Sequence, residues 1–285
     1  MKLLGCISLI CFSLVAATIA EQFSLVEEDP DIHQNEQLQQ QHGLGCTHPP
    51  YNIHFLSRDP IVIYIVDFLT PVERRHLLKT SASSFVNSQT ADEDGTETLR
   101  SSRRSKSATV IRDEVTECVE ERALLFQGFD TAPSHLEPLQ LVRYQINETY
   151  DLHTDWFTSP AQTTVETHGG NRLTSFFAYV TASDDITGGG TNFPLLDPPT
   201  DKRWCEYVDC DVPLEDGVTF LPIPGNAVFW VNLVGGGGKG DPRTIHSGAV
   251  VTSGEKVGLN IWTREGPLSH KFRGEASNDD HEDDE

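Results

Sequence analysis

The chain has 285 residues, of which 43 are Asp or Glu and 21 are Lys or Arg, so its formal net charge at pH 7 is -22. This length suits one large domain or at most two small ones. Such a negative charge argues against nucleic acid and anionic membranes as partners.

Residues 1–20 are expected to form a cleavable secretory signal. Met1 and Lys2 precede an apolar run that ends in small residues before Glu21, which is how such signals are built. The run approaches the length that spans a bilayer, so an uncleaved signal anchor is the alternative, and membrane contact is expected only in that case. We therefore expect the protein in the secretory pathway, either in the endoplasmic reticulum lumen or secreted.

Residues 21–57 are expected to form a flexible polar linker, because most of this segment is rich in Gln, Glu and His with few aromatic residues. The β-branched and aromatic run at residues 60–68 then predicts a buried strand. Thr70 and Glu73 form a capping pattern around a proline at the first helical position. We expect a helix from there to about Phe85.

Residues 87–107 are polar and are expected to form a loop, in which Arg103 and Arg104 are either a processing site or part of a substrate-facing surface. A second helix should run from about Asp113 to Gln127 and end at Gly128. Five strand-like segments separated by turns follow, at residues 139–146, 173–181, 226–233, 244–251 and 256–263. Helices followed by at least five strands predict an α+β domain whose strands form a sandwich or barrel.

Four cysteines remain once the signal is removed: Cys46, Cys118, Cys205 and Cys210. In a secretory protein they are expected to form disulfides, and three connectivities are possible. A Cys205–Cys210 loop is the easiest to close, whereas Cys118 is the best candidate for a free buried thiol. Asn147 is in the single N-glycosylation triplet of the sequence and is therefore the candidate glycosylation site.

His153 and Asp155 lie two positions apart in YDLHTDWF, so both side chains point the same way if the segment is extended. One imidazole and one carboxylate do not complete a metal site. His246 is the best third ligand, because Gly248 on the same strand face leaves space for a ligand. Two His and one carboxylate leave three open positions, as in non-haem Fe(II) oxygenases. The alternative is an ordinary hydrogen-bonded surface pair.

Lys256 is expected to lie on the same inner face as the metal ligands. Residues 252–256 form a turn after the strand of His246, so that strand and the next one should pair as antiparallel neighbours. Lys256, Asn260 and Trp262 would then share one face. A lysine buried there needs an anion, which the distal carboxylate of 2-oxoglutarate would supply. If this face points to solvent, Lys256 is an ordinary charged edge residue.

Four motifs, taken in order, resemble the catalytic domain of the prolyl 4-hydroxylases. They are LVRYQINETYDLHTDWF, GGGTNFP, GNAVFWVNL and RTIHSGAVVTSGEKVGLNIW. The spacings agree as well, since Lys256 lies ten positions after His246 and Trp262 six after Lys256. The resemblance implies a dioxygenase domain at residues 58–266, with a double-stranded β-helix (jelly-roll) core and N-terminal supporting helices. Residues 267–285 are left as an acidic disordered tail.

The resemblance also implies three groups of site residues, with no catalytic residue beyond them. They are the iron ligands His153, Asp155 and His246, the cosubstrate-binding residues Lys256, Tyr144 and Thr191, and the substrate-binding residues Tyr150, Arg172 and Trp262. Tyr150 and Trp262 could equally be core aromatics. His168 lies close to these motifs but is not expected to be a ligand.

The implied function is hydroxylation of proline in a Pro-rich peptide or protein, with Fe(II), 2-oxoglutarate, dioxygen and L-ascorbate. A hydroxylase of another side chain or of a small metabolite is the first alternative. A non-catalytic jelly-roll binding module is the second. Residues 100–105 resemble the loop that covers the bound peptide, whereas the long insert at residues 197–217 either caps the site or decorates the surface. The chain shows no separate peptide-substrate domain, which puts collagen itself in doubt.

Overall fold

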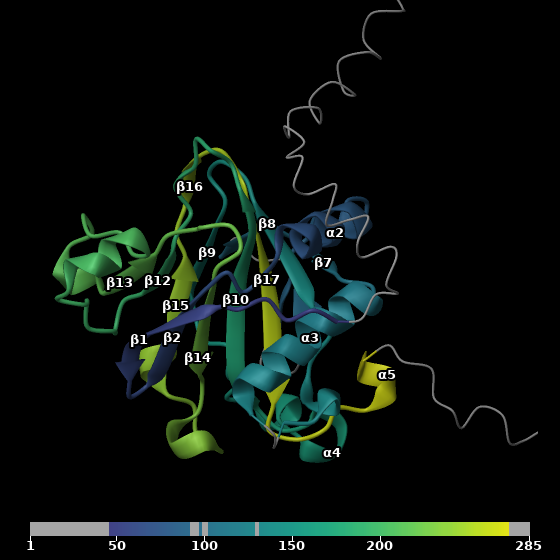
Figure 1. The fold of residues 1–285 in the computed structure, drawn as a ribbon. Helices are drawn as coiled ribbons and strands as arrows, with labels where there is room; N and C mark the ends of the chain where they lie inside the picture. Colours follow the sequence, from purple (N-terminus) through teal and green to yellow (C-terminus); the bar gives the residue numbers. More distant parts are fainter. Residues whose placement is uncertain (1–45, 92–96, 99–101, 129–130, 274–285) are drawn as a thin grey trace, which may run out of the picture. The chain divides into compact units, whose positions relative to one another are not determined.

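Two antiparallel sheets face each other, and helices cover the outer side of the larger one (Figure 1). In spatial order the larger sheet contains β1 (Asn52–Arg58), β2 (Ile61–Val66), β14 (Ala227–Val231), β10 (Arg172–Ala182), β17 (Lys256–Arg264), β8 (Gln140–Tyr144), β7 (Lys106–Thr109) and β3 (Val86–Asn87). The smaller contains β13 (Val218–Phe220), β12 (Thr191–Phe193), β15 (His246–Gly248), β9 (Thr149–His153) and β6 (Arg103–Arg104). Two short pairs are separate: β4 (Thr90–Ala91) with β5 (Glu97–Thr98), and β11 (Thr187–Gly188) with β16 (Val251–Ser253).

The computed structural model describes residues 46–91, 97–98, 102–128 and 131–273. The predicted signal, most of the predicted linker and the chain from residue 274 onward lie outside the described residues. From Cys46 the described chain belongs to one compact unit, which is rich in sheet and has few helices. Within it, no helix combines the length and the apolar character needed to cross a bilayer.

The capping pattern predicted for the first helix is present in α2 (Pro71–Ser81). The Thr70 hydroxyl accepts a hydrogen bond from the Glu73 amide, and the Glu73 carboxylate accepts one from the Thr70 amide. The predicted extension to Phe85 is wrong. Two serines follow Ala82, and serine side chains compete with helical backbone hydrogen bonds.

The second predicted helix, α3 (Glu114–Gln127), begins and ends where the sequence predicts. Asp113 accepts hydrogen bonds from the amides of Val115 and Thr116, and Gly128 ends the helix with a φ of 102°. The other helices are short: α4 (Val165–His168), α5 (His270–Arg273) and 3-10 turns at Pro133–His135, Pro160–Gln162, Lys202–Glu206, Leu214–Asp216, Val234–Gly236 and Pro242–Thr244.

Alternation along the central strands β10 and β17 divides the core into two layers. On β10, Phe176 packs toward the helices, whereas Phe177 and Tyr179 pack between the two sheets. On β17 the predicted alternation is also seen, because Lys256, Asn260 and Trp262 line the space between the sheets, whereas Val257, Leu259 and Ile261 pack under the helices.

The predicted pairing between the strand of His246 and the strand of Lys256 is wrong. β15 pairs with β9 and β12 in the smaller sheet, whereas β17 pairs with β10 and β8 in the larger one. Between them β16 pairs with β11, so the chain crosses from one sheet to the other. Lys256 therefore approaches the ligands from the opposite sheet.

Two predicted boundaries differ from the structure. Residues 52–58 belong to β1 instead of the linker, because they pair with β2 and Leu56 packs against the core between the sheets. The predicted disordered tail begins with ordered residues. Leu268 is buried and its amide donates to the Ser134 carbonyl, and α5 follows directly.

The four described cysteines form two disulfides, Cys46–Cys118 and Cys205–Cys210. The expected disulfides are therefore present, and the alternative of a free buried thiol at Cys118 is excluded. The members of the Cys46–Cys118 pair are 72 residues apart in the sequence. The easily closed Cys205–Cys210 loop forms as expected, within the insert at residues 197–217.

The predicted polar loop at residues 87–107 is partly sheet. β6 pairs with β9 in the smaller sheet and β7 pairs with β8 in the larger one. Arg103 lies on β6 with its guanidinium 4.7 Å from the ring centre of Tyr150. This placement beside the cavity favours a substrate-facing surface over a processing site. Residues 92–96 and 99–101 lie outside the described residues.

Candidate active site

One cavity of about 2040 Å³ lies between the sheets, and its lining includes every ligand, cosubstrate and substrate residue implied by the sequence resemblance. These are Tyr144, Tyr150, His153, Asp155, Arg172, Thr191, His246, Lys256 and Trp262. They come from β8, β9, β10, β12, β15 and β17 and the turn after β9. The fold thus brings together segments that are far apart in the sequence.

His153 and His246 are cross-strand partners on β9 and β15. Asp155 follows two residues after His153. Its Oδ1 lies 4.0 Å from Nε2 of His153 and 3.9 Å from Nε2 of His246. One ligand atom from each residue lies within 4.8 Å of the other two. Two imidazoles and one carboxylate are the donor set of non-haem Fe(II) sites, so these residues fit a divalent iron ion.

Both imidazoles are oriented by backbone carbonyl groups. Nδ1 of His153 lies 2.8 Å from the Asp151 carbonyl oxygen, and Nδ1 of His246 lies 2.9 Å from that of Thr244. Since a carbonyl only accepts, each Nδ1 carries the proton and each Nε2 keeps its lone pair for a metal. Burial and the neighbouring His246 also lower the pKa of His153 to about 3. His153 is therefore neutral at physiological pH, as metal binding requires.

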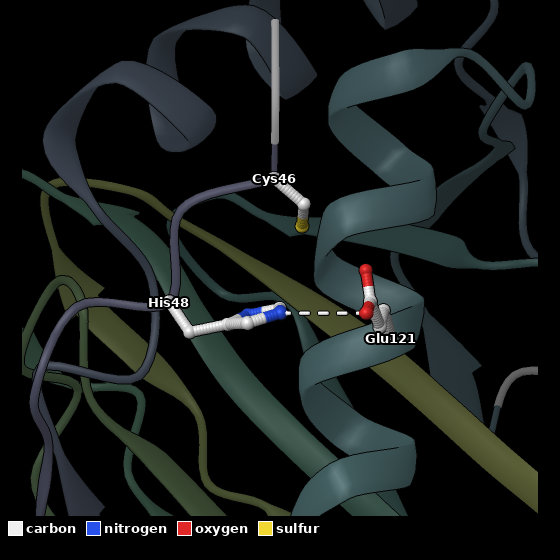
Figure 2. A group of neighbouring side chains, drawn as sticks. All are labelled: Cys46, His48 and Glu121. Carbon is white, nitrogen blue, oxygen red and sulfur yellow. Dashed lines mark ion pairs between the residues drawn. The ribbon is translucent and has the colours of Figure 1, made fainter.

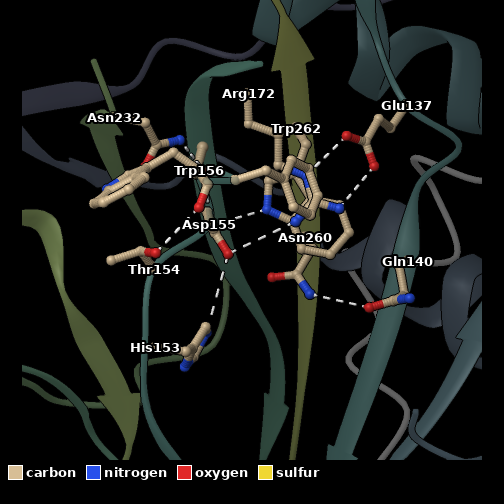
Figure 3. Close-up of polar contacts among 12 residues, drawn as sticks. Glu137, Gln140, His153, Thr154, Asp155, Trp156, Arg172, Asn232, Asn260 and Trp262 are labelled. Atoms are coloured by element: carbon tan, nitrogen blue, oxygen red, sulfur yellow. Dashed lines mark hydrogen bonds and ion pairs between the residues drawn. The ribbon is translucent and has the colours of Figure 1, made fainter. Parts of the chain in front are cut away.

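The carboxylate of Asp155 is divided between two tasks (Figure 3). Its Oδ2 accepts hydrogen bonds from the Ser175 hydroxyl at 2.7 Å and from Nε1 of Trp262 at 2.9 Å. Its Oδ1 faces the two imidazoles. Burial tends to raise the pKa of Asp155, but the nearby imidazoles, Arg172 and the Ser175 hydrogen bond lower it to about 2. The group is ionised at neutral pH.

Lys256 is the second unusual feature of the cavity. Its side chain is 0% exposed, and its ammonium has no hydrogen-bond partner among the described residues. Burial lowers its pKa to about 7. Three aromatic rings surround the ammonium, with ring centres 4.8 Å away for Tyr144, 5.3 Å for Phe177 and 5.9 Å for Tyr179. A buried cation without a counter-ion is costly, so this position fits a bound anion.

The wall around Lys256 contains the two other residues expected to bind cosubstrate. Tyr144 is the cross-strand partner of Lys256, and burial raises its pKa, so the phenol stays protonated. The hydroxyl of Thr191 accepts a hydrogen bond from Tyr179 at 2.8 Å. The hydroxyl groups of Tyr144 and Tyr179 therefore remain neutral beside the cation.

Arg172 lies in the wider part of the cavity, where its guanidinium is held on three sides (Figure 3). Nε and Nη2 each donate to Glu137 at 2.8 Å, the ring centre of Trp262 is 3.6 Å away, and Nη1 lies 3.9 Å from Asp155 Oδ1. Burial tends to raise the pKa of Glu137, but Arg172 and Arg264 lower it. Arg172 and Arg264 both donate hydrogen bonds to Glu137. These residues are distant in sequence, and no sequence motif indicates their contacts.

A second cluster with metal-binding residue types lies on the helix side of the larger sheet and consists of Cys46, His48 and Glu121 (Figure 2). The sulfur of Cys46 is bonded to Cys118, so it is not a free thiolate ligand. His48 and Glu121 form an ion pair at 3.7 Å. This cluster fastens the start of the described chain to α3 and lacks the donor set of a metal site.

Three of the four remaining predicted residues, Asn147, Cys205 and Cys210, do not line the cavity. Asn147 is exposed in the turn between β8 and β9, with a φ of 66°. The Cys205–Cys210 insert contacts the larger sheet through Tyr207, whose ring centre is 4.8 Å from that of Tyr64. Neither Cys205 nor Cys210 lines the cavity. His168 does line it, but it is not part of the His–Asp–His set.

No family model matches the chain. Prolyl 4-hydroxylase 1 of Arabidopsis thaliana is 29% identical over 216 residues, which cover 74% of this chain and 71% of that protein. The human prolyl 4-hydroxylase subunit alpha-3 is 26% identical over 219 residues, which cover 76% of this chain and 36% of that protein. The chain is thus similar in sequence to prolyl 4-hydroxylases over about three quarters of its length. The resemblance inferred from its motifs is thereby confirmed.

This relationship extends to the fold of a solved prolyl hydroxylase. The collagen prolyl hydroxylase of Paramecium bursaria Chlorella virus-1, in a truncated form, aligns with a TM-score of 0.50 and 19% sequence identity. The alignment covers 78% of this chain and 97% of that one. At this identity the comparison concerns the arrangement of the sheets alone.

Proposed function

We propose that this chain is an Fe(II)- and 2-oxoglutarate-dependent dioxygenase that hydroxylates peptidyl proline. The observation that carries the proposal is the pairing, in one cavity, of a His–Asp–His set with the buried, partnerless ammonium of Lys256. The first feature fits iron and the second fits the distal carboxylate of a dicarboxylic 2-oxo acid. The prolyl 4-hydroxylase relatives support the same reaction.

In this proposal His153 and His246 hold the iron through Nε2, and Asp155 holds it through Oδ1. Three positions then stay open, two for the 2-oxo acid and one for dioxygen. When bound, iron and 2-oxoglutarate supply the oxidising chemistry, in which dioxygen gives one oxygen atom to the substrate and one to succinate, with loss of carbon dioxide. We expect L-ascorbate to support turnover.

The chain itself supplies orientation and exclusion of water. Lys256 pairs with the distal carboxylate and so fixes the direction in which the 2-oxo acid enters. Tyr144 and Thr191 line the same pocket. The three aromatic rings around the ammonium keep bulk water from competing with the anion, which strengthens this charge pair.

The size of the cavity supports a peptide substrate over a small metabolite. Pockets for small molecules usually measure roughly 300–1,000 Å³, and this cavity of about 2040 Å³ exceeds that range. A Pro-rich segment is already extended and rigid, so it would enter such a groove at low entropic cost. Tyr150, Arg172 and Trp262 line the cavity beside the proposed iron ligands and are the residues that we expect to contact the peptide.

Several finer features belong to the same proposal. We infer an α+β domain with a double-stranded β-helix core, in which α2 and α3 are the supporting helices. Two disulfides agree with an oxidising compartment, which supports the secretory pathway, either the endoplasmic reticulum lumen or secretion. Exposed Asn147 would carry the glycan.

The test is 2-oxoglutarate turnover with a proline-rich peptide, Fe(II) and ascorbate. We expect succinate release and a gain of one oxygen atom in the peptide, located on proline by mass spectrometry. His153→Ala should abolish both signals, while the Cys205→Ser/Cys210→Ser variant, altered away from the cavity, should retain them. A gain of oxygen on another residue would redirect the substrate assignment. Absence of succinate with every peptide tried would favour a binding module.

A further inference from the structure

Behind the site, a series of buried hydrogen bonds runs from Trp230, whose ring packs on His246, to Asp155. Nε1 of Trp230 donates to Asn232 Oδ1 at 2.8 Å, Asn232 Nδ2 donates to the Ser175 hydroxyl at 2.8 Å, and that hydroxyl donates to Asp155 Oδ2 at 2.7 Å. The Trp230 ring in turn packs on the His246 imidazole, with ring centres 4.8 Å apart. Ser175, Asn232 and Trp230 are each at most 1% exposed.

The donor and acceptor groups fix the direction of each hydrogen bond in this series. Indole nitrogen only donates, so the amide oxygen of Asn232 must face Trp230 and its NH₂ must face Ser175. The single hydroxyl hydrogen of Ser175 is then left for Asp155. With Trp262 donating to the same oxygen, Oδ2 receives two hydrogens and Oδ1 is the free acceptor. A protonated or rotated carboxylate would break this order.

We propose that Ser175 and Asn232 are positioning residues for the metal, acting through Asp155. Ser175 and Trp262 occupy Oδ2 with their hydrogen bonds, and Asn232 orients the Ser175 hydroxyl, so Oδ1 alone is presented to the ion. This inference rests on the proposed function, because it assigns a role toward the same iron. Partners of metal-ligating groups typically change metal affinity by about tenfold to hundredfold when removed.

The structure offers a matched pair of positions on one strand for the test. Thr174 precedes Ser175 on β10, is 5% exposed, and donates its hydroxyl to Gln127 Oε1 at 2.6 Å on the opposite face. Thr174→Val and Ser175→Ala each remove one buried hydroxyl, with the loss of one hydrogen bond at Thr174 and two at Ser175, which also accepts from Asn232. Only Ser175→Ala removes a hydrogen bond to a candidate ligand. A purely structural role predicts the same consequences for both variants.

The experiment measures Mn(II) binding by calorimetry on the full chain, with thermal unfolding measured in parallel. Binding that persists in His153→Ala is subtracted, because acidic segments also bind divalent cations. We expect Ser175→Ala to weaken the remaining Mn(II) affinity about tenfold to hundredfold, with Thr174→Val unchanged. Ser175→Thr, which keeps the hydroxyl, should recover most of the affinity.

Asn232→Asp provides a second measurement that does not depend on a cavity in the core. The side chain keeps its shape and still accepts from Trp230, but it cannot donate to Ser175, so the Ser175 hydrogen turns away from Asp155. We expect a loss of Mn(II) affinity similar to that of Ser175→Ala. Both changes interrupt the same series of hydrogen bonds. The Mn(II) affinity of the double variant should therefore be no lower than that of the single variant with the lower affinity.

The outcomes separate this inference from the proposed function. If the unaltered protein and His153→Ala bind Mn(II) equally, the iron site itself fails. If the unaltered protein binds at the site and Ser175→Ala binds as tightly, with Asn232→Asp also unchanged, the positioning role is overturned. Equal losses in Thr174→Val and Ser175→Ala would likewise overturn it, since they would reflect general destabilisation.

Discussion

Two fully buried cations in this protein have opposite surroundings. Arg122 on α3 is 1% exposed and donates to both carboxylate oxygens of Glu73 and to the carbonyls of Phe68 and Thr47. Lys256 on β17 is 0% exposed and has no hydrogen-bond partner among the described residues. Arg122 therefore has its anion built into the fold. The comparison teaches that a buried charge serves architecture when its partner is internal and binding when its partner must come from outside.

The largest effect on stability should come from the partnered cation. Arg122→Met leaves the Glu73 carboxylate buried without its counter-ion, so we expect the free energy of unfolding to fall by about 3–5 kcal/mol. Chemical denaturation of the purified variant measures this loss. 2-Oxoglutarate affinity in the fraction that remains folded should be unchanged, and a lost affinity would show that the two regions are not separate.

The same substitution at the other cation should give the reverse pattern. Lys256→Met removes a charge that has no internal partner, so the free energy of unfolding without ligand should not fall. Binding of 2-oxoglutarate to the Mn(II)-loaded protein should weaken by about 2–5 kcal/mol, because the distal carboxylate then lacks its counter-ion. Calorimetry gives the affinity. Retained binding in Lys256→Met would mean that the anion sits elsewhere.

The contrast can be sharpened with pH. Burial lowers the pKa of the Lys256 ammonium to about 7 in the empty site, and pairing with a carboxylate raises it again. Above pH 7, binding of 2-oxoglutarate must therefore take up a proton, and its affinity should fall by up to about tenfold per pH unit, or ~1.4 kcal/mol. Calorimetry in buffers of different ionisation enthalpy measures how many protons are taken up when 2-oxoglutarate binds. Lys256→Arg should bind without this pH dependence.

The pH dependence of stability has the opposite sign. Between pH 7 and the ordinary lysine pKa of 10.5, the unfolded chain binds the Lys256 proton and the empty folded protein does not. This group should therefore make the empty protein more stable as pH rises through that range. The contribution of Lys256 is measured as the difference in unfolding free energy between the unaltered protein and Lys256→Met at each pH.

The smallest expected effect tests how far the Arg122 network extends. Thr70 and Glu73 cap α2 reciprocally, and Glu73 Oε2 accepts from both the Thr70 amide and Arg122. Thr70→Ala removes one side of the cap and should cost about 1 kcal/mol of unfolding free energy. Thr70→Ser keeps the hydroxyl and should cost less. A loss approaching that of Arg122→Met would show that the cap orients the buried ion pair.

Local signals predicted much of the fold because their physics is local. The caps at Thr70 and Asp113 lie within three residues of the amides that they satisfy, and His153 and Asp155 follow the two-residue period of an extended chain. The residue pattern also proposed His246 and Lys256 as partners, and the resemblance implied the same roles. Their convergence on one cavity agrees with these assignments, whereas the metal and substrate roles themselves stay predictions.

The features that the sequence did not reveal depend on contacts across the fold. The strands of His246 and Lys256 are close in the chain, yet β15 pairs with β9 in the smaller sheet and β17 pairs with β10 in the larger one. The Asn232–Ser175 hydrogen bond joins residues 57 positions apart. Neither residue has a motif of its own. A role for the buried Ser175 and Asn232 can be inferred only once the hydrogen bond from Ser175 to Asp155 is known.

The glycine opposite Phe177 sets a limit on what the lysine end of the cavity accepts. A Cβ on Gly258 would meet the Phe177 ring at 2.1 Å, so the tip of that ring packs directly against the β17 backbone. Phe177 also lies beside the Lys256 ammonium, with its ring centre 5.3 Å away. If the proposed function holds, Phe177→Leu would enlarge the lysine end of the cavity and should favour a longer cosubstrate such as 2-oxoadipate.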